Sequence, residues 1–252
     1  MVKTIWLVLT AYNEEANLAS LLGGLRLVCL TDKEHDIRLV IVDDGSQDGT
    51  AKTAQDFNEI IPTIVIRHRV NQGLGASLRD GLRYAVGNAP STAVIITMDA
   101  DNTHPVELIP EMVAAIESGA DVVIASRYHA GAKVVGLAWY RRFLSVLAAQ
   151  IMRVLFPCTG LRDYTCGFRA YRNDVLKRAF TTFGDDFVGC AGFQCTADIL
   201  LKLRMLSPPV QFTEVPLTLR YDRKRGKSKM KVLRTILGTL HLIIKRRMGS
   251  VR

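Results

Sequence analysis

Apolar runs alternate with amphipathic segments along the first half of the chain. The runs that have the length of buried strands are Thr4–Leu9, Arg38–Val42, Thr63–Arg67, Ala93–Met98 and Val122–Ala125. Between them, apolar residues recur at helical spacing in Glu15–Leu27, Thr50–Glu59, Gly75–Val86 and Pro105–Glu117. Strands that alternate with helices of this length form βαβ units. The pattern predicts an α/β fold with a mostly parallel central sheet flanked by helices.

The second half is less regular. The pattern there predicts a helix over Lys133–Phe156, a turn and strand over Asp163–Tyr171, a helix over Thr196–Leu206, a strand over Val210–Leu219 and a terminal helix over Val232–Arg247. The chain has 252 residues, enough for one large domain. We predict a main domain over residues 1–230 and a basic amphipathic C-terminal helix within residues 231–252.

Polar residues follow four of the predicted strands, at the point where each strand ends. These turns are Tyr12-Asn13-Glu14, Asp43-Asp44-Gly45-Ser46, Asn71-Gln72-Gly73 and Asp99-Ala100-Asp101. Ligands of parallel sheets bind beyond the carboxyl ends of the strands. Asn13 and Ser46 could equally be helix caps. Helix capping does not account for several acids that meet at one edge, so we expect a binding site there.

Asp99 and Asp101 are the most informative of these acids. Carboxylates two residues apart on a turn can both reach one hard cation, and Mg²⁺ or Mn²⁺ would bridge them to substrate phosphates. Most Asp-x-Asp pairs are ordinary loop acids, but this pair directly follows a buried strand. His104 is either a further metal ligand or a residue that precedes a helix starting at Pro105, and we favour the second interpretation.

The chain lacks the sequence motifs of two common classes of nucleotide-binding protein. The chain has no GxxxxGK[ST] sequence, and no GxGxxG follows the first strand, so a P-loop NTPase and a dinucleotide dehydrogenase are disfavoured. The glycines of the segment 71–82, "NQGLGASLRDGL", fit either close strand–helix packing or direct phosphate contact.

Charge is unevenly distributed along the chain. The net charge is +9, but residues 220–252 contain twelve Lys or Arg and one acid, so the other residues sum to −2. A local basic field favours an anionic partner such as nucleotide phosphate, nucleic acid or lipid. Nucleic acid is disfavoured because no set of stacking aromatic residues accompanies the basic segment. The five cysteines, with no CxxC, indicate reduced thiols in a cytosolic protein without a metal cluster.

The terminal helix carries an apolar stripe. No uninterrupted apolar run of about 20 residues exists, so we predict no transmembrane helix, and no signal peptide is visible. Arg234, His241 and Lys245 fall largely away from the stripe, which consists of Leu233, Ile236, Leu237, Leu240 and Ile244. Such a helix can lie in the lipid headgroup region, or it can pack on the domain core.

Seven motifs in order resemble the GT-A glycosyltransferases of family 2, and within them the dolichol-phosphate mannose synthase group. They are TAYNEE, VDDGSQDGT, NQGLGAS, DADNTHP, SRY, DYTCGFRAYR and YDRKRGKSKM, and they span roughly residues 4–230. The resemblance implies a GT-A fold, a nucleotide-sugar donor, a bound Mg²⁺ or Mn²⁺ ion and inversion at the sugar carbon. It favours transfer of mannose from GDP-mannose to a polyisoprenyl phosphate. UDP-glucose, another donor, or a hydroxyl acceptor remains the alternative.

The resemblance also assigns roles to residues. Base and ribose would contact Ala11, Tyr12, Glu14, Val42 and Asp44. Metal and diphosphate would lie at Asp99, Ala100 and Asp101, and phosphates would contact Arg127, Arg223 and Lys229. The residues predicted as catalytic are Asp101, Arg142 and Asp163, with Arg142 near a donor or acceptor phosphate.

Three positions qualify the resemblance. Thr10 stands where the family usually has Pro, and Asp198 best matches a Glu found near the acceptor in many members. We expect no third side-chain metal ligand at Thr103.

The acceptor determines what else the site needs. A hydroxyl acceptor requires a general base, whereas a lipid phosphate is already nucleophilic and requires cations that hold two phosphates close together. We therefore expect a peripheral protein on the cytoplasmic face of a membrane, with a membrane protein as a further candidate partner. An adaptor without activity is disfavoured by the intact acid pair, and a nucleotidyltransferase by the lack of a Gly-rich basic loop after the first strand.

Overall fold

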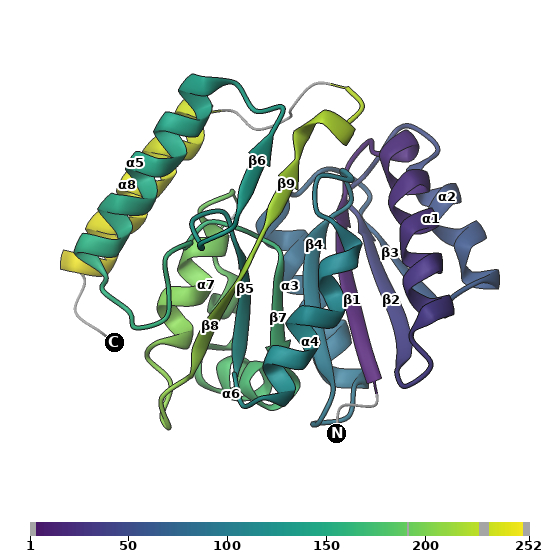
Figure 1. The fold of residues 1–252 in the computed structure, drawn as a ribbon, viewed down its shortest axis with the longest axis horizontal. Coiled ribbons are helices and arrows are strands. Elements are labelled where there is room, and N and C mark those ends of the chain that lie inside the picture. Colours follow the sequence, from purple (N-terminus) through teal and green to yellow (C-terminus); the bar gives the residue numbers. More distant parts are fainter. Residues whose placement is uncertain (1–3, 191, 227–231, 249–252) are drawn as a thin grey trace.

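The fold is organised around one large sheet (Figure 1), whose longest strands are mostly apolar. The structure, a computed structural model, describes residues 4–190, 192–226 and 232–248. Within these ranges seven strands pair in the order β3-β2-β1-β4-β7-β5-β8. Their bounds are β1 Thr4–Ala11, β2 Asp36–Asp43, β3 Thr63–Arg67, β4 Val94–Asp99, β5 Val122–Ser126, β7 Arg169–Arg172 and β8 Phe212–Pro216. Only β7 runs antiparallel to its neighbours in this sheet. This confirms the predicted α/β class.

Helices cover both faces of the sheet, which is why β1, β2, β4 and β5 contain continuous apolar runs without alternation. On one face α3 (Leu74–Asn88) contacts β1 and β2 and lies beside α6 (Asn173–Phe183) and α7 (Cys195–Leu203). The other face carries α1 (Glu15–Thr31) and α4 (Ile109–Glu117), joined through the 3₁₀ turn η2 (Val106–Leu108). Three further short elements adjoin these helices, namely α2 Thr50–Asp56, η1 Phe57–Glu59 and η3 Gly184–Val188.

The predicted elements of the first half are confirmed, with small shifts at their ends. The first helix continues to Thr31, and the helix expected from Thr50 ends at Asp56 and is followed by η1. The helix expected from Pro105 begins as the turn η2, and Pro110 occupies the first turn of α4. In the second half, helix α6 was not predicted, although its buried residues Val175, Leu176 and Ala179 recur at helical spacing.

Two predictions in the second half are wrong. Residues 133–156 do not form one helix, because the chain turns at Gly136, where φ is +77°, between β6 (Lys133–Val135) and α5 (Trp139–Leu155). Residues 210–219 do not form one strand: the chain leaves the main sheet after Pro216, and β9 (Thr218–Arg220) pairs with β6 instead. Strand β9 leads directly into the 3₁₀ turn η4 (Tyr221–Arg223).

The terminal helix α8 (Val232–Met248) uses two different faces. One face packs on the domain: Leu242 is buried, and Arg246 pairs with Asp198 of α7, with 2.7 Å between Nη2 and Oδ1. The opposite face exposes most of the predicted stripe, namely Ile236, Leu237, Leu240 and Ile244. Packing on the domain is thus confirmed for one face, and contact of the exposed face with lipid stays a prediction.

Helix α5 also exposes apolar side chains, including Trp139, Phe143, Leu147 and Val154. Figure 1 shows α5 and α8 at the end of the molecule beyond β8, away from β3. Among the described residues, every helix is too short or too polar to cross a lipid bilayer.

We expect Gly81→Ala to lower the free energy of unfolding by about 1–3 kcal/mol, because overpacking strains a close-packed core. A Cβ atom at Gly81 would lie 2.6 Å from Cγ1 of Val8 and 2.9 Å from Cγ2 of Val42. Gly87, in the same helix, has nothing within 4 Å of such an atom. Gly87→Ala should therefore be neutral or stabilising by up to about 1 kcal/mol. Denaturant unfolding compares the two, and equal effects would show that α3 does not pack as described.

Candidate active site

Three strand ends meet at one edge of the sheet. Thr10 of β1 lies opposite Asp99 of β4 and accepts a hydrogen bond from the Ala100 amide at 3.1 Å. The Asp44 amide donates to the Ala11 carbonyl at 2.8 Å. The carboxyl ends of β1, β2 and β4 are therefore joined directly, and the residues predicted to share this edge do so.

Asp99 and Asp101 place two acids where water is largely excluded. Burial raises the pKa of Asp99, and the neighbouring charge of Asp101 raises it further. Burial also acts to raise the pKa of Asp101, but the ammonium group of Lys224 outweighs this effect and lowers it. The pair therefore needs positive charge, and Lys224 supplies part of it.

Lys224 was not among the predicted site residues. Its Nζ lies 2.6 Å from Oδ2 of Asp101 and 4.0 Å from Oε1 of Glu14. Burial acts to lower the pKa of Lys224, but the charge of Asp101 raises it overall. The sequence singled out the basic segment that contains Lys224 but did not indicate which of its cations turns inward.

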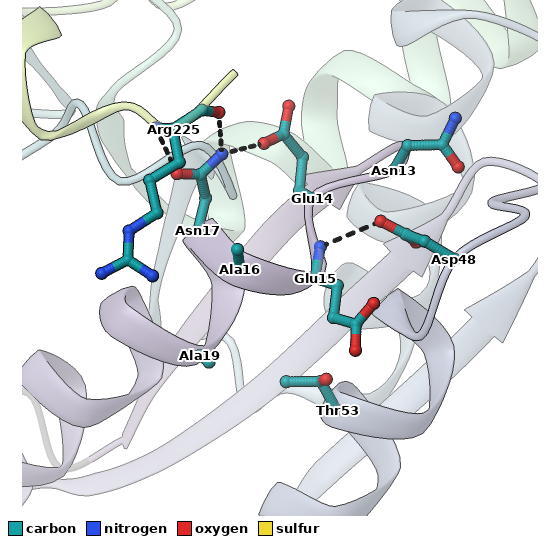
Figure 2. Close-up of a pocket in the computed structure, with 9 residues that line it drawn as sticks. All are labelled: Asn13, Glu14, Glu15, Ala16, Asn17, Ala19, Asp48, Thr53 and Arg225. Carbon is teal, nitrogen blue, oxygen red and sulfur yellow. Dashed lines mark hydrogen bonds between the residues drawn. The ribbon is translucent and has the colours of Figure 1, made fainter.

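The loop that carries Lys224 is attached to α1. Asn17 accepts a hydrogen bond from the Arg225 amide at 2.7 Å and donates to the Arg225 carbonyl at 2.9 Å (Figure 2). The same Asn17 amide donates to Oε2 of Glu14 at 2.6 Å. Asn17 thus ties the basic loop to the first strand end, a role that its sequence position does not reveal.

Thr103 and His104 support the acid pair from within the protein. The Thr103 hydroxyl and amide both donate to Oδ1 of Asp101, at 2.7 and 3.1 Å. Nδ1 of His104 accepts the Asp99 amide at 3.4 Å, and the ring stacks on Phe168 with 5.1 Å between centroids. His104 therefore supports the loop at the acid pair. The favoured interpretation is right only in part, because Pro105 precedes the 3₁₀ turn η2 and α4 begins at Ile109.

Asp163 forms an ion pair with Arg127. The guanidinium group donates from Nε to Oδ2 at 2.8 Å and from Nη2 to Oδ1 at 2.7 Å, and Asp163 is fully buried. Burial acts to raise the pKa of Asp163, but Arg127 outweighs it and the pKa is lowered. The Asp163 amide in turn donates to Glu214 at 2.6 Å. In this geometry Asp163 orients Arg127, and both of its carboxylate oxygens accept hydrogen bonds from protein groups. Its catalytic role stays a prediction.

Asp44 is likewise committed to the protein. Its carboxylate accepts the amides of Gln72 and Gly73, both at 2.8 Å, and contacts Nδ1 of His68 at 2.7 Å. The amides of the glycine segment therefore face a protein carboxylate, and Gly81 further along packs on the sheet. This geometry favours the packing interpretation of the segment.

Two hollows flank this edge. One, of about 420 Å³, is lined by residues of α1, by Asp48 and by Arg225 (Figure 2). The other, of about 580 Å³, is lined by Tyr12, by the turn after β2 and by the segment that contains Arg67 and Arg69.

The remaining predicted residues are distributed as follows. Ala11, Val42 and Ala100 are buried, and the side chain of Val42 faces Gly81. Arg142 is exposed on α5, and no contact with the acid pair is seen among the described residues. Arg223 is exposed, and Lys229 lies outside the described residues.

Asp198, Asn13 and Ser46 form ion pairs or hydrogen bonds with other protein groups. Asp198 pairs with Lys202 at 2.8 Å and with Arg246. Asn13 and Ser46 do not cap helices: the Asn13 amide donates to the Ser46 hydroxyl at 2.8 Å, which joins the first two strand-end turns.

The chain belongs to the glycosyl transferase family 2, whose family model matches residues 6–180. Polyprenol monophosphomannose synthase of Mycolicibacterium smegmatis is 34% identical, over 88% of this chain and 79% of that protein. Dolichol-phosphate mannosyltransferase of Pyrococcus furiosus is 33% identical, over 89% of this chain but 58% of that protein. Undecaprenyl-phosphate mannosyltransferase of Micrococcus luteus is 31% identical, over 88% and 86%. The resemblance stated from the motifs is confirmed.

Solved structures support the fold. Glucosyl-3-phosphoglycerate synthase of Mycobacterium tuberculosis, in complex with Mn²⁺, uridine diphosphate and glucosyl-3-phosphoglycerate, matches with a TM-score of 0.65. The match covers 99% of this chain and 81% of that one, at 19% identity. A complex of the same enzyme with Mg²⁺ and uridine diphosphate matches at a TM-score of 0.64 over 97% of this chain and 79% of that one, also at 19% identity. At this identity the likeness establishes the GT-A fold only.

Removing the Asp163 charge should destabilise the protein. At pH 7, Asp163→Asn should lower the free energy of unfolding by about 3–5 kcal/mol, because it leaves Arg127 buried without its partner. Asp174→Asn, which breaks the exposed Arg172–Asp174 pair, should cost less than about 1 kcal/mol.

The pH dependence of this effect has a defined sign. The folded-state pKa of Asp163 is lowered, so its contribution is present above the ordinary carboxyl pKa of about 4 and is lost as pH falls through the folded value. Unfolding curves of wild type and Asp163→Asn should therefore converge below about pH 4. A gap that stays constant with pH would contradict the ion pair.

Proposed function

We propose that this protein is an inverting glycosyltransferase that moves mannose from GDP-mannose to a polyisoprenyl phosphate, such as dolichyl or undecaprenyl phosphate. The proposal rests on the acid pair Asp99 and Asp101, which a lysine from the basic loop faces at the strand-end edge. The names of the three relatives, all mannosyl enzymes of lipid phosphates, support the choice of sugar and acceptor.

The donor nucleotide would bind along the ends of β1 and β2. Base and ribose would contact Tyr12, which lines the larger hollow, and Glu14, which lines the smaller one. Ala11, Val42 and Asp44 would contribute through the shape of the strand ends, since their side chains are buried. Arg67 and Arg69 add positive charge to the larger hollow.

A Mg²⁺ or Mn²⁺ ion fits the acid pair. Both acids offer carboxylate oxygens, the ligands that these ions prefer, and burial raises the pKa of Asp99, so a cation bound there would offset the cost of ionising it. Among the described residues no cluster of three or more His, Cys, Asp or Glu is arranged to hold a metal. Asp99 and Asp101 would therefore hold the ion together with donor phosphates and water. A bound ion would stabilise the charge that builds on the leaving diphosphate.

The acceptor phosphate would be held by cations. Arg127 is fixed in place by Asp163 and keeps part of its surface accessible, while Arg223 and Lys229 belong to the basic loop segment. A phosphate nucleophile needs no general base, which agrees with an Asp163 that is fully engaged by Arg127. Arg142 would approach a phosphate only if α5 faced the acceptor.

The protein would work as a peripheral protein on the cytoplasmic face of a membrane, with or without a membrane-protein partner. The exposed apolar faces of α5 and α8 suit an interface, and Lys245, Arg246 and Arg247 lie at the end of the α8 stripe. In this arrangement residues 1–230 carry the transferase domain, and residues 231–252 add a membrane-facing helix that also packs on α7.

Lipid extraction after incubation with labelled donor tests the activity. We expect label in lipid with GDP-mannose, polyprenyl phosphate and Mg²⁺ or Mn²⁺, little with UDP-glucose, and none after chelation. Asp101→Asn should lower transfer at least about a hundredfold, because it removes a charge-stabilising element. The proposed donor is wrong if UDP-glucose supports transfer and GDP-mannose does not. The proposed acceptor is wrong if only a hydroxyl compound is labelled, and the proposed metal is wrong if activity is full in chelator.

Vesicle sedimentation tests the membrane contact. Wild type should sediment with anionic vesicles and be released by salt, since each basic residue at the surface contributes about 1 kcal/mol. Leu237→Glu in α8 and Phe143→Glu in α5 should each lower partitioning at least about tenfold, because each removes an apolar anchor. Leu27→Glu on α1 is the matched control, since Leu27 and Leu237 are 65% and 63% exposed. If both α5 and α8 variants sediment like the control, the membrane contact lies elsewhere.

A further inference from the structure

The Lys224 ammonium group lies where a metal ion would be expected to meet Asp101. Of the two Asp101 oxygens, Oδ1 already accepts two hydrogen bonds from Thr103. The other, Oδ2, faces Lys224 at 2.6 Å. A divalent ion bound to Oδ2 would lie at about 2.0–2.1 Å from it, and two cations cannot share that position at close range. Lysine and metal therefore compete for the same oxygen.

Lys224 can leave Asp101 without disrupting its loop. The loop backbone is attached separately, through the two hydrogen bonds between Asn17 and Arg225. The lysine side chain has four flexible carbons, so its ammonium group can move several ångströms while the backbone stays in place. A diphosphate bound at the acid pair would offer that group an alternative anionic partner.

We propose that Lys224 is a built-in counter-ion that neutralises Asp101 in the donor-free enzyme, gives way to the divalent cation, and then contacts the donor diphosphate. This inference rests on the proposed metal site. In the free enzyme Lys224 keeps the buried acids from repelling each other and lowers affinity for free metal. In the donor complex the same residue stabilises the metal–diphosphate unit. The enzyme would thus take up metal together with donor and bind metal alone only weakly.

Manganese binding, measured by the loss of the free Mn²⁺ signal in electron paramagnetic resonance, tests the exchange. In the absence of nucleotide, Lys224→Gln should bind Mn²⁺ at least about fivefold more tightly than wild type, because the competing ion pair is gone. Arg225→Gln is the matched control: it removes one charge from the adjacent position, but it is the Arg225 backbone that bonds to Asn17. Its Mn²⁺ affinity should stay close to that of wild type.

The second arm adds GDP and measures its binding in Mn²⁺ by calorimetry. Lys224→Gln should now bind GDP at least about fivefold more weakly than wild type, because the diphosphate has lost a cation. Opposite signs in the two arms are the distinctive result. Circular dichroism confirms that each variant is folded before its affinity is compared.

The possible results distinguish failure of the lysine–metal exchange from failure of the metal site or of the donor. Equal Mn²⁺ affinity in wild type and Lys224→Gln, with weaker binding in Asp101→Asn, would overturn the exchange and leave the metal site intact. If Lys224→Gln binds Mn²⁺ more tightly but GDP unchanged, Lys224 competes with metal without contacting the diphosphate, and the second half of the proposal is wrong. No difference in Mn²⁺ binding between wild type, Lys224→Gln and Asp101→Asn would refute the metal site and the exchange together. Absence of GDP binding to wild type would refute the proposed donor, while the Mn²⁺ arm still decides the exchange.

Discussion

The site depends on the repulsion between Asp99 and Asp101, two acids at the end of a buried strand. The sheet fixes them there, because β4 lies between β1 and β7 and Thr10 of β1 is opposite Asp99. Water screens these two charges poorly. Burial raises the pKa of Asp99, and the charge of Asp101 raises it further, so ionising both acids costs free energy. A fold that keeps such a pair needs a cation beside it. Lys224 provides one from the protein itself, and a divalent ion with a diphosphate would provide more.

Hydrogen bonds hold Arg127 and the backbones of the surrounding loops in place. Asp163 fixes Arg127, Asp44 fixes the segment after β3, and Asn17 fixes the loop that carries Lys224. In each case a polar side chain is hydrogen-bonded to another group of the protein. Charge stabilisation in a transferase requires such preorganisation, because groups already in place need not reorganise as the leaving group departs.

The sequence was sufficient to predict most of the strands, the edge of the sheet that carries the site, and the acid pair, since apolar runs that end in acids have few other interpretations in an α/β fold. It was insufficient where a contact is made by residues far apart in the chain. The pairing of Lys224 with Asp101 joins residues 123 positions apart, and no local pattern distinguishes Lys224 from Arg223. The split at Gly136 was missed because an apolar helix pattern continues across it. The ion pair between Asp163 and Arg127 could not be predicted, because the two residues are far apart in the sequence and the motifs favour a phosphate as the partner of Arg127.

A crystal structure with GDP and Mn²⁺, recorded at a wavelength where manganese scatters anomalously, shows directly which cation contacts Asp101 in the donor complex. We expect an anomalous peak in contact with Asp99, Asp101 and the diphosphate, with Nζ of Lys224 moved from Asp101 to a phosphate oxygen. A structure in which GDP and Mn²⁺ are bound elsewhere while Lys224 remains on Asp101 would contradict this expectation.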